Sequence, residues 1–283
     1  MGAPELVPQL LRGPSRRSQA WSPERASARP DSVFPRAQVR WALQERRLRV
    51  AYQPIVRLED GLVVGQEALA RLLTPQGTTL AAERFIDAAA SIGLEPRIDA
   101  DVTAQVMAAA ARPGGAQGKL FMNCCSAFLA QPLCVELLAR RHQDWRDAWP
   151  HAPAAPWVLE ITERNLDADP QQLLRTLAPV LDLGFELALD DFGGTRSAFA
   201  YLLRLPIRYL KFDQSLVQAA ATQARAEQVL RRLQDMARDL NMITIAEGLE
   251  ARDHLDCAQA LGIDWGQGYL WGRAGGLAES EPQ

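Results

Sequence analysis

Short apolar runs that end in turn residues recur along most of the chain. Such runs are typical of buried strands, and eight of them are expected between positions 50 and 268. These runs are Val50–Val56, Val63–Leu69, Leu120–Asn123, Val158–Ile161, Phe185–Leu189, Tyr209–Phe212, Ile243–Ala246 and the segment before Gly268. Asp60-Gly61 lies between the first two runs, and it predicts a tight turn that joins them as a hairpin.

Longer segments with a helical period separate most of these runs. A short amphipathic helix is predicted on Val39, Ala42, Leu43 and Leu48. The other predicted helices are Ala81–Ile92, Asp99–Ala111, Ser126–Arg141, Pro170–Leu183, Ser197–Leu203, Ala219–Leu240 and Arg252–Leu261, and a loop is predicted over 144–156. Alternating strands and helices indicate a parallel sheet, and a closed barrel is the economical arrangement of about eight strands. The expected fold class is therefore α/β.

The N-terminal segment has a different composition. Residues 1–35 are rich in Pro, Arg, Ser and Ala and carry little apolar periodicity, so we expect a disordered tail. Contact of this basic tail with a partner or a membrane surface is the alternative. A signal peptide does not fit, because Pro8 and Gln9 interrupt the apolar stretch. Residues 277–283 are expected to form a short C-terminal tail.

Composition and charge exclude several classes of function. The 283 residues carry a formal net charge of −3, which gives no general case for nucleic-acid binding. No apolar run is long enough to cross a membrane. The four cysteines lack CxxC spacing, which favours a reducing cytoplasm, and the three histidines lack metal-ligand spacing and are expected at the surface.

Polar residues stand where the predicted strands end. They are Glu67, Asn123, Glu160, Asp190, Asp191, Lys211, Glu247 and Gln267. Each has an ordinary structural interpretation when taken alone; the Asp190-Asp191 pair, for example, suits the start of a solvated loop or a helix cap. In a barrel, however, the carboxyl ends of the strands meet at one mouth. We therefore expect these side chains to converge on one site.

Charge decides what such a cluster can hold. Five carboxylates face one lysine, so cations are needed to balance the site. Every candidate ligand atom is an oxygen, which favours Mg²⁺ or Mn²⁺ over zinc. Two such ions about 3.5–4 Å apart can clamp the attacking and leaving oxygens of a phosphoryl displacement. Asp190 would bridge them, and Lys211 would orient or deprotonate the attacking water or stabilise charge on the phosphoryl oxygens.

A set of ordered motifs carries a family resemblance. The motifs are Tyr52-Gln53-Pro54, Glu67-Ala68-Leu69-Ala70-Arg71, Asn123, Glu160-Ile161-Thr162-Glu163, Asp190-Asp191-Phe192-Gly193, Leu210-Lys211-Phe212-Asp213, Ala246-Glu247-Gly248-Leu249-Glu250 and Gln267-Gly268-Tyr269. With them the chain resembles the EAL-domain phosphodiesterases of bacterial cyclic-di-GMP signalling, with an expected domain over 36–276. The resemblance implies a modified TIM (β/α)8 barrel with one antiparallel strand. It also implies a homodimer that hydrolyses cyclic-di-GMP to linear pGpG with two Mg²⁺ or Mn²⁺ ions per site.

The resemblance also implies individual roles. The residues that match the metal ligands are Glu67, Asn123, Glu160, Asp190, Asp191 and Glu247. Lys211 matches the catalytic lysine, and Glu247 and Glu163 belong with it to the catalytic set, Glu163 as the acid that anchors the loop after the Asp pair. Gln53, Arg71 and Gln267 match substrate contacts, Arg71 by its fork of donors. Glu250 matches a supporting acid.

The chain departs from the family pattern in the loop Gly194–Ala198. Arg196 stands where an aromatic residue is usual, and Ala198 stands where a serine is usual. In the family this loop links dimer contacts to the metal site. Two alternatives to the enzyme therefore stay open: a non-hydrolytic cyclic-di-GMP receptor, and an interaction protein of the same fold. Leu72 replaces a frequent tryptophan, which is expected to alter the pocket wall, and Cys124-Cys125 are expected to be small buried thiols.

Overall fold

The computed structural model describes residues 36–113, 115, 118–152, 154–162, 169–193 and 199–275. Four predictions from the sequence lie outside these residues. They concern the tails 1–35 and 277–283, the acid Glu163 and the loop Gly194–Ala198.

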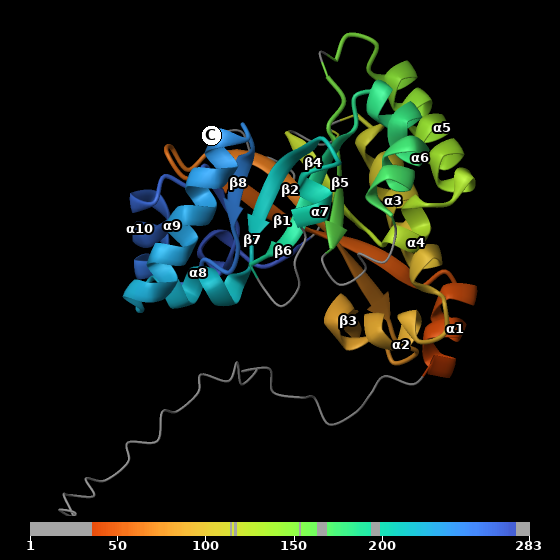
Figure 1. Ribbon diagram of the computed structural model, residues 1–283. Coiled ribbons are helices and arrows are strands. Elements are labelled where there is room, and N and C mark those ends of the chain that lie inside the picture. Colours follow the sequence, from red (N-terminus) through yellow and green to blue (C-terminus); the bar gives the residue numbers. More distant parts are fainter. Residues whose placement is uncertain are drawn as a thin grey trace, which may run out of the picture. The chain divides into compact units, whose positions relative to one another are not determined.

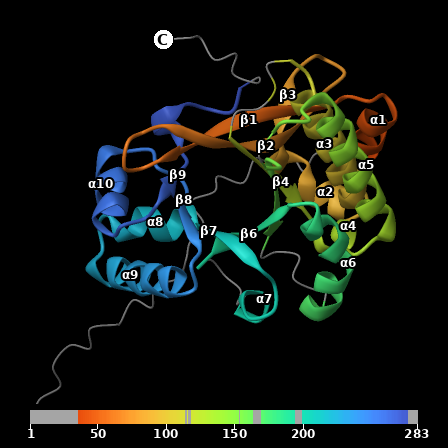
Figure 2. The same ribbon diagram turned by 90° about the horizontal axis from the view of Figure 1, so that it is seen from above.

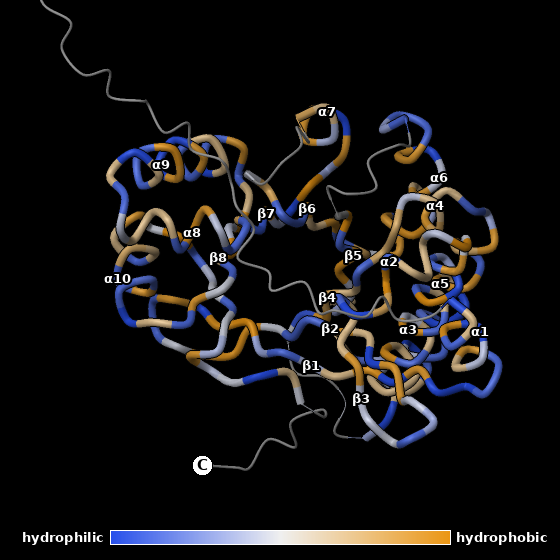
Figure 3. The backbone as a smooth tube through the Cα atoms, turned by 90° about the horizontal axis from the view of Figure 1, so that it is seen from below, coloured by the Kyte–Doolittle hydropathy of each residue, from blue (hydrophilic) through white to orange (hydrophobic). Residues whose placement is uncertain are grey.

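Eight strands form a closed ring, which Figure 3 shows end-on with the helices outside it. Their order around the ring is β1, β9, β8, β7, β6, β5, β4 and β2, and β1 closes it by pairing with β2. The bounds are β1 Leu48–Arg57, β2 Val63–Leu73, β4 Lys119–Cys124, β5 Trp157–Thr162, β6 Glu186–Phe192, β7 Ile207–Phe212, β8 Ile243–Ala246 and β9 Trp265–Gly266. A ninth strand, β3 (Thr79–Ala81), pairs only with β2 in the described sheet.

One strand of the ring runs against the others. β1 is antiparallel to both of its neighbours, β2 and β9, whereas the remaining neighbours in the ring are parallel. The hairpin that reverses the chain contains Gly61, whose φ of +74° lies in the region that glycine adopts at no steric cost. The expectation of a modified eight-stranded barrel with one antiparallel strand is confirmed.

Helices cover the outside of the ring. Their bounds are α1 Arg36–Gln44, α2 Ile86–Ala90, α3 Glu95–Ala110, α4 Ser126–Leu129, α5 Pro132–Ala148, α6 Pro170–Asp182, α7 Phe199–Leu202, α8 Gln214–Ala220, α9 Ala224–Asp239 and α10 Arg252–Ala260. Figures 1 and 2 show α8, α9 and α10 together on one side of the barrel and α3, α5 and α6 on the other. The main apolar core lies between these helices and the strands. A smaller apolar cluster fills the barrel itself.

Several element boundaries differ from the sequence prediction. The segment predicted as one helix over Ala81–Ile92 contains the end of β3, a 3-10 turn (Ala82–Arg84) and the short α2. The helix predicted over Ala219–Leu240 is two helices, and α8 begins earlier because Asp213 accepts a hydrogen bond from the Ser215 N–H and caps it. Leu48 begins β1 rather than completing α1.

Prolines set other boundaries that the periodicity missed. Pro132 occupies the first turn of α5, so the predicted helix over Ser126–Arg141 is divided into α4 and α5. α5 then continues to Ala148, so the first five residues of the predicted 144–156 loop are helical. Pro96 likewise lies in the first turn of α3, which begins at Glu95 rather than Asp99. α7 ends at Leu202, one residue before the predicted end of the helix over Ser197–Leu203, whose first two residues lie outside the described part of the chain.

The buried thiols were predicted and the buried histidine was not. Cys124 and Cys125 are both buried, as expected. His142 was expected at the surface but is also buried, because its Nδ1 accepts a hydrogen bond from Trp157 Nε1 at 3.2 Å and its ring lies beside Trp145. Among the residues that the structure describes, no helix is both long enough and apolar enough to span a bilayer.

A buried acid fastens α3 to the end of β4. Asp99 Oδ2 accepts a hydrogen bond from the Cys125 N–H at 2.7 Å, directly after the strand that carries Asn123. Burial raises the pKa of Asp99 from its usual value to about 7, and the charge of Glu95 adds to the increase. The contact helps to fix where β4 ends, and with it the position of Asn123.

This elevated pKa predicts a pH-dependent stability. Because the folded protein holds the proton more tightly than the unfolded chain, whose Asp pKa is about 3.9, stability from Asp99 is full below that value and is lost as the pH rises to about 7. Asp99→Asn keeps an oxygen that can accept the hydrogen bond from the Cys125 N–H, but its side chain does not titrate. In urea unfolding, the wild-type free energy of unfolding minus that of the variant should fall by at least about 1 kcal/mol between pH 4.5 and 7.5. A difference that does not change with pH contradicts the assignment.

Candidate functional site

The strand register brings the predicted polar residues to one end of the barrel interior. Asn123 in β4 is level with Glu160 in β5, and Thr162 at the end of β5 is level with Asp190 in β6. Alternate residues of a strand face the same side, so side chains of matching phase from neighbouring strands point into the barrel. Glu160, Asp190 and Lys211 are all buried there.

Lys211 is the centre of this cluster. Its side chain comes from β7 and is fully buried. Carboxylate oxygens from four different segments lie within ion-pair distance of its Nζ atom. The distances are 2.7 Å to Glu247 Oε1, 2.9 Å to Glu160 Oε1, 3.0 Å to Asp190 Oδ1 and 3.4 Å to Glu67 Oε2. The convergence predicted from the strand ends therefore occurs, and one ammonium group lies within ion-pair distance of four acids.

Glu67 is held by amides on both sides. The prediction that it closes its strand is wrong, because β2 continues to Leu73. Asn123 Nδ2 donates to its Oε1 at 2.8 Å, and Gln267 Nε2 donates to its Oε2 at 2.5 Å. Gln267 Nε2 also lies 3.1 Å from Gln53 Oε1. Glu67 is thus bonded directly to Asn123 and to Gln267, and through Gln267 it is linked to Gln53, a second predicted substrate contact.

The adjacent Asp pair extends the cluster toward the mouth of the barrel. Asp191 has a φ of +57°, an uncommon conformation for a residue other than glycine. Asp190, Asp191 and Glu247 can each offer one oxygen such that the three atoms lie within 4.8 Å of one another. Strained backbone at the end of a strand is one way to aim two neighbouring carboxylates toward a common point.

Negative charge is in excess at this site. Burial raises the pKa of Glu160 and Glu247 well above the usual range; the charge of Lys211 lowers it and nearby acids raise it, but burial is the largest influence. Burial would raise the pKa of Glu67 too, but Lys211 and the amides of Gln267 and Asn123 lower it overall. Burial would lower the pKa of Lys211, and the four acids outweigh this and raise it. The folded state therefore favours protons on some of these acids in the absence of other cations.

Unsatisfied polar atoms show that the cluster fits a cation. Both oxygens of Glu160 and Oδ1 of Asp190 are buried without a hydrogen bond, although Lys211 Nζ is close to both side chains. One ammonium group has only three N–H bonds and cannot direct one at each of four carboxylates. Buried oxygens without donors are expensive in an empty interior and suitable for a hard divalent cation. The side chains that fit such an ion are those of Glu67, Asn123, Glu160, Asp190, Asp191 and Glu247.

Two other predicted site residues lie apart from these contacts. Arg71 is in the same phase of β2 as Glu67 and Leu69, so it continues the inward face beyond the cluster; its Nη1 donates to the Ala70 carbonyl at 3.0 Å. Glu250 is exposed, and the contact seen for it is a backbone hydrogen bond to His254. Leu72, expected at the pocket wall, is fully buried in the main core, because it has the opposite phase of β2 from Glu67.

Sequence reasoning missed the part played by two glycines next to the site. Gly248 follows Glu247 with a φ of +65°, and a Cβ there would lie 2.1 Å from the Gln214 side chain. A Cβ on Gly268 would lie 2.2 Å from the Leu249 carbonyl oxygen. These close approaches let Leu249 donate to the Gln267 carbonyl at 3.0 Å, which fixes Gln267 beside Glu67. The sequence feature that could have indicated these close approaches is a glycine directly after a site residue, in Glu247-Gly248 and in Gln267-Gly268.

The family model for the EAL domain matches residues 36–274 of the chain. The chain belongs to the EAL domain family. Cyclic di-GMP phosphodiesterase PdeB of Shewanella oneidensis is 30% identical over 244 residues, which are 84% of this chain and 28% of that protein. Cyclic di-GMP phosphodiesterase NbdA of Pseudomonas aeruginosa is 31% identical over 86% of this chain and 31% of that protein. The probable cyclic di-GMP phosphodiesterase PdeB of Escherichia coli is 31% identical over 85% of this chain and 45% of that protein. The chain thus spans less than half the length of these relatives.

Solved EAL structures share the fold. The PaMucR phosphodiesterase in complex with c-di-GMP is 26% identical with a TM-score of 0.75, over 85% of this chain and 97% of that one. The FimX EAL domain of Pseudomonas aeruginosa bound to c-di-GMP is 26% identical with a TM-score of 0.72, over 84% of this chain and 95% of that one. EAL domains have a TIM-barrel-like fold, and this chain has it with one added strand, β3.

The position of Lys211 predicts a large penalty when its charge is removed. In EDTA at pH 7, Lys211→Met should lower the free energy of unfolding by about 3 kcal/mol, because buried carboxylates lose their cation. The loss should shrink toward pH 5 as these acids take up protons. Urea unfolding of both proteins measures it. Arg97→Met, which breaks an exposed pair with Asp101, is the matched control and should cost less than about 1 kcal/mol. Equal effects of the two substitutions would refute the central role of Lys211.

Proposed function

We propose that this domain hydrolyses cyclic-di-GMP to linear pGpG with two Mg²⁺ or Mn²⁺ ions. The observation that carries the proposal is the convergence of three buried carboxylates and one partly buried carboxylate on Lys211, with Asn123 and Gln267 bound to one of them. Relatives named as cyclic di-GMP phosphodiesterases and related EAL structures that contain c-di-GMP support the choice of substrate.

The acids and the amide form the cation-binding part of the site. In the proposal the ligands are the side chains of Glu67, Asn123, Glu160, Asp190, Asp191 and Glu247. Asp190 belongs both to the carboxylates around Lys211 and to the group that it forms with Asp191 and Glu247, which supports its assignment as a ligand that two ions would share. Bound divalent ions would supply Lewis acidity at the phosphodiester and lower the pKa of the attacking water.

Lys211 and its neighbours act on the water and the phosphoryl group. The ammonium group approaches the carboxylates from inside the barrel, where its contacts fix their orientation. It is placed to orient the attacking water through a hydrogen bond and to offset negative charge on the phosphoryl oxygens. We assign Glu163 to anchoring the loop after the Asp pair and Glu250 to a supporting role, both by their motif positions.

Substrate contacts extend from the cluster along the β1–β2 ribbon. Gln53 and Glu67 are directly opposite each other in the register, and Gln267 bridges them. Arg71 lies four residues further along the same face of β2, and no acid among the described residues pairs with it. A guanidinium group without an acid partner is suited to a phosphate, which it can bind through two hydrogen bonds. We also expect a homodimer that acts in the cytoplasm.

A second candidate function is a receptor that binds cyclic-di-GMP without turnover. It is favoured by the sequence of the loop Gly194–Ala198, where Arg196 and Ala198 depart from the family pattern. The two functions share the same metal and substrate contacts and differ only in the chemical step. Product formation therefore separates them.

The test of the proposed function is incubation of the purified protein with cyclic-di-GMP and Mn²⁺, followed by chromatography of the products. We expect metal-dependent pGpG, with a rate at least about a hundredfold lower in Lys211→Ala. Light scattering of the same sample gives the oligomeric state. Tight binding without product would replace the enzyme by the receptor. Absence of both product and binding would refute each of them.

Removal of the bridging acid should abolish both catalysis and metal-dependent stabilisation. Asp190→Asn retains the shape of the side chain and loses its charge, so Mn²⁺ should raise the melting temperature of the wild type and have a much smaller effect on the variant. Thermal unfolding with and without Mn²⁺ measures this. Asp235→Asn, an exposed acid on α9, should respond like the wild type. Full turnover in Asp190→Asn would exclude the two-metal assignment.

The role of Arg71 can be separated from that of the cluster. Because Arg71 makes none of the contacts around Lys211, Arg71→Ala should raise KM about tenfold or more and leave kcat within a few-fold of the wild type. Steady-state kinetics over a range of cyclic-di-GMP concentrations gives both constants, and Arg71→Lys should recover part of the loss. A change confined to kcat would show that Arg71 does not act through substrate binding.

A further inference from the structure

A large cavity lies at the mouth of the barrel opposite the Lys211 cluster. Its volume is about 920 Å³, within the range of small-molecule sites in proteins. Its wall includes the first residues of β2, β4, β6 and β8, the last residue of β1, and residues at the ends of α3 and α5. This is the amino end of the parallel strands, whereas the carboxylate cluster lies at their carboxyl ends.

An apolar layer separates this cavity from the cluster. On β4, the inward positions are Lys119 at the cavity, Phe121 in the layer and Asn123 at the cluster. The same succession recurs on β6 and β8. The members of the layer are Ile55, Phe121, Val158, Ala188, Tyr209 and Ile245, all buried. A molecule in the cavity therefore cannot reach Lys211, and the cavity would form a separate site.

Aromatic residues line part of the cavity. The rings of Tyr209 and Trp265 have centroids 5.3 Å apart, and Phe121 packs edge-on against Tyr209 at 5.0 Å. Trp149 also lines the cavity with 38% of its surface exposed, and its Nε1 donates to the Ala110 carbonyl. The indole of Trp149 is fixed by its hydrogen bond and that of Trp265 by ring packing, so they offer preformed flat surfaces to an aromatic ring.

Positive charge predominates among the charged residues of the wall. The one acid among the lining residues is Glu186, and it is already engaged by Lys119 Nζ at 2.5 Å and by the Tyr209 hydroxyl at 3.0 Å. Arg57 pairs with the exposed Asp60 at 2.8 Å. Arg208 is exposed and donates to the Asn241 carbonyl, and no carboxylate in the described part of the chain lies within ion-pair distance of it. The wall therefore favours an anion near Arg208.

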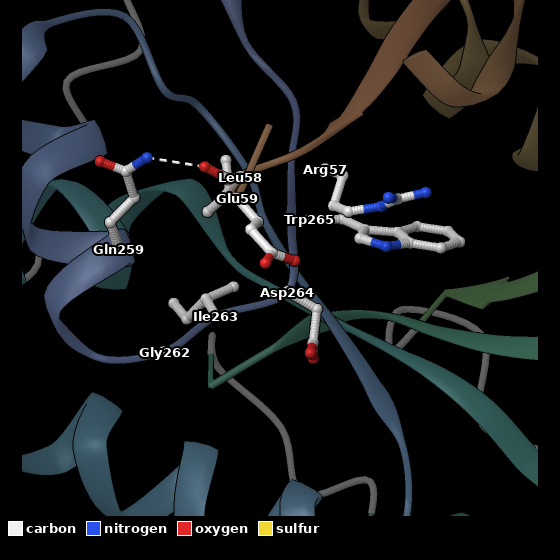
Figure 4. Close-up of a pocket in the computed structure, with 8 residues that line it drawn as sticks. All are labelled: Arg57, Leu58, Glu59, Gln259, Gly262, Ile263, Asp264 and Trp265. Carbon is white, nitrogen blue, oxygen red and sulfur yellow. Dashed lines mark hydrogen bonds between the residues drawn. The ribbon is translucent and has the colours of Figure 1, made fainter. Parts of the chain in front are cut away.

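A smaller neighbouring cavity of about 410 Å³ shares Arg57 and Trp265 with the large one (Figure 4). Its wall includes two acids, Glu59 and Asp264, and Asp264 is held by the backbone N–H and the hydroxyl of Thr244 at 2.9 and 2.8 Å. These acids disfavour an anion in the smaller cavity. Arg57 and Trp265 thus mark the boundary between the two cavities, and an anionic ligand is expected in the larger cavity, near Arg208.

We propose that the amino-end mouth of the barrel binds a planar aromatic anion of nucleotide size. The ring of the ligand would pack on the indole groups of the wall, and its anionic group would bind Arg208. The site is independent of the proposed hydrolysis. The N-terminal residues of the chain itself are a poor occupant, because residues 1–35 carry many arginines and the wall is positive as well.

The test uses guanosine monophosphate (GMP) in EDTA, with equilibrium dialysis for affinity and tryptophan fluorescence as a second signal. Guanosine and inorganic phosphate are the matched ligands that lack the anionic group or the ring. Arg208→Ala removes an exposed side chain with little risk to folding, and Arg208→Lys restores the charge. Arg71→Ala reports binding at the opposite mouth, and Arg232→Ala, an exposed arginine of α9, is the surface control.

The proposal predicts saturable GMP binding that is at least about tenfold weaker in Arg208→Ala, partly restored in Arg208→Lys and unchanged in Arg71→Ala and Arg232→Ala. Guanosine and phosphate should each bind at least about tenfold more weakly than GMP. Three results would overturn it: no saturable binding of GMP, weakening by Arg71→Ala instead of Arg208→Ala, or guanosine binding as tightly as GMP.

Discussion

The contact of one buried ammonium group with four carboxylates is the constraint on which the site depends. Lys211 is fully buried in the barrel interior, and the acids around it come from segments that are far apart in the sequence. Their mutual repulsion is only partly offset by one positive charge, so the folded state favours protons on some of these acids unless cations bind. A barrel can maintain this arrangement because its closed hydrogen-bonded ring fixes each strand independently of the charges inside it.

The barrel interior is organised in layers along its axis. Residues two apart on a strand face the same way. β4, β6 and β8 therefore each place one residue at the amino-end cavity, the next in the apolar layer and the third at the cluster. On β8 this third residue is Glu247, which lies just beyond the end of the strand. The apolar layer of the middle isolates the carboxylates from water on the amino side. The same layer separates the cations and aromatic rings of the opposite mouth from the cluster, so they take no part in its chemistry.

Much of the site followed from the sequence, because a strand end is marked by a change from apolar to polar residues. The Asp190-Asp191 pair and Lys211 were predicted in this way, and the convergence of strand ends in a barrel brought them together. Glu67 was misplaced relative to its strand because β2 extends beyond the barrel as a ribbon with β1, and ribbon length depends on pairing rather than composition. His142 was misplaced because its burial depends on Trp157, which is distant in the sequence.

The most direct test of this account is calorimetric titration of Mn²⁺ in EDTA-stripped protein at pH 7, repeated in buffers with different ionisation enthalpies. The raised pKa values of Glu160 and Glu247 mean that the metal-free cluster carries protons that a divalent cation must displace. The account predicts net proton release on binding to the wild type, and weak binding with little release in Asp190→Asn. Tight binding without any proton release would contradict the claim that the metal-free acids hold protons which a divalent cation must displace.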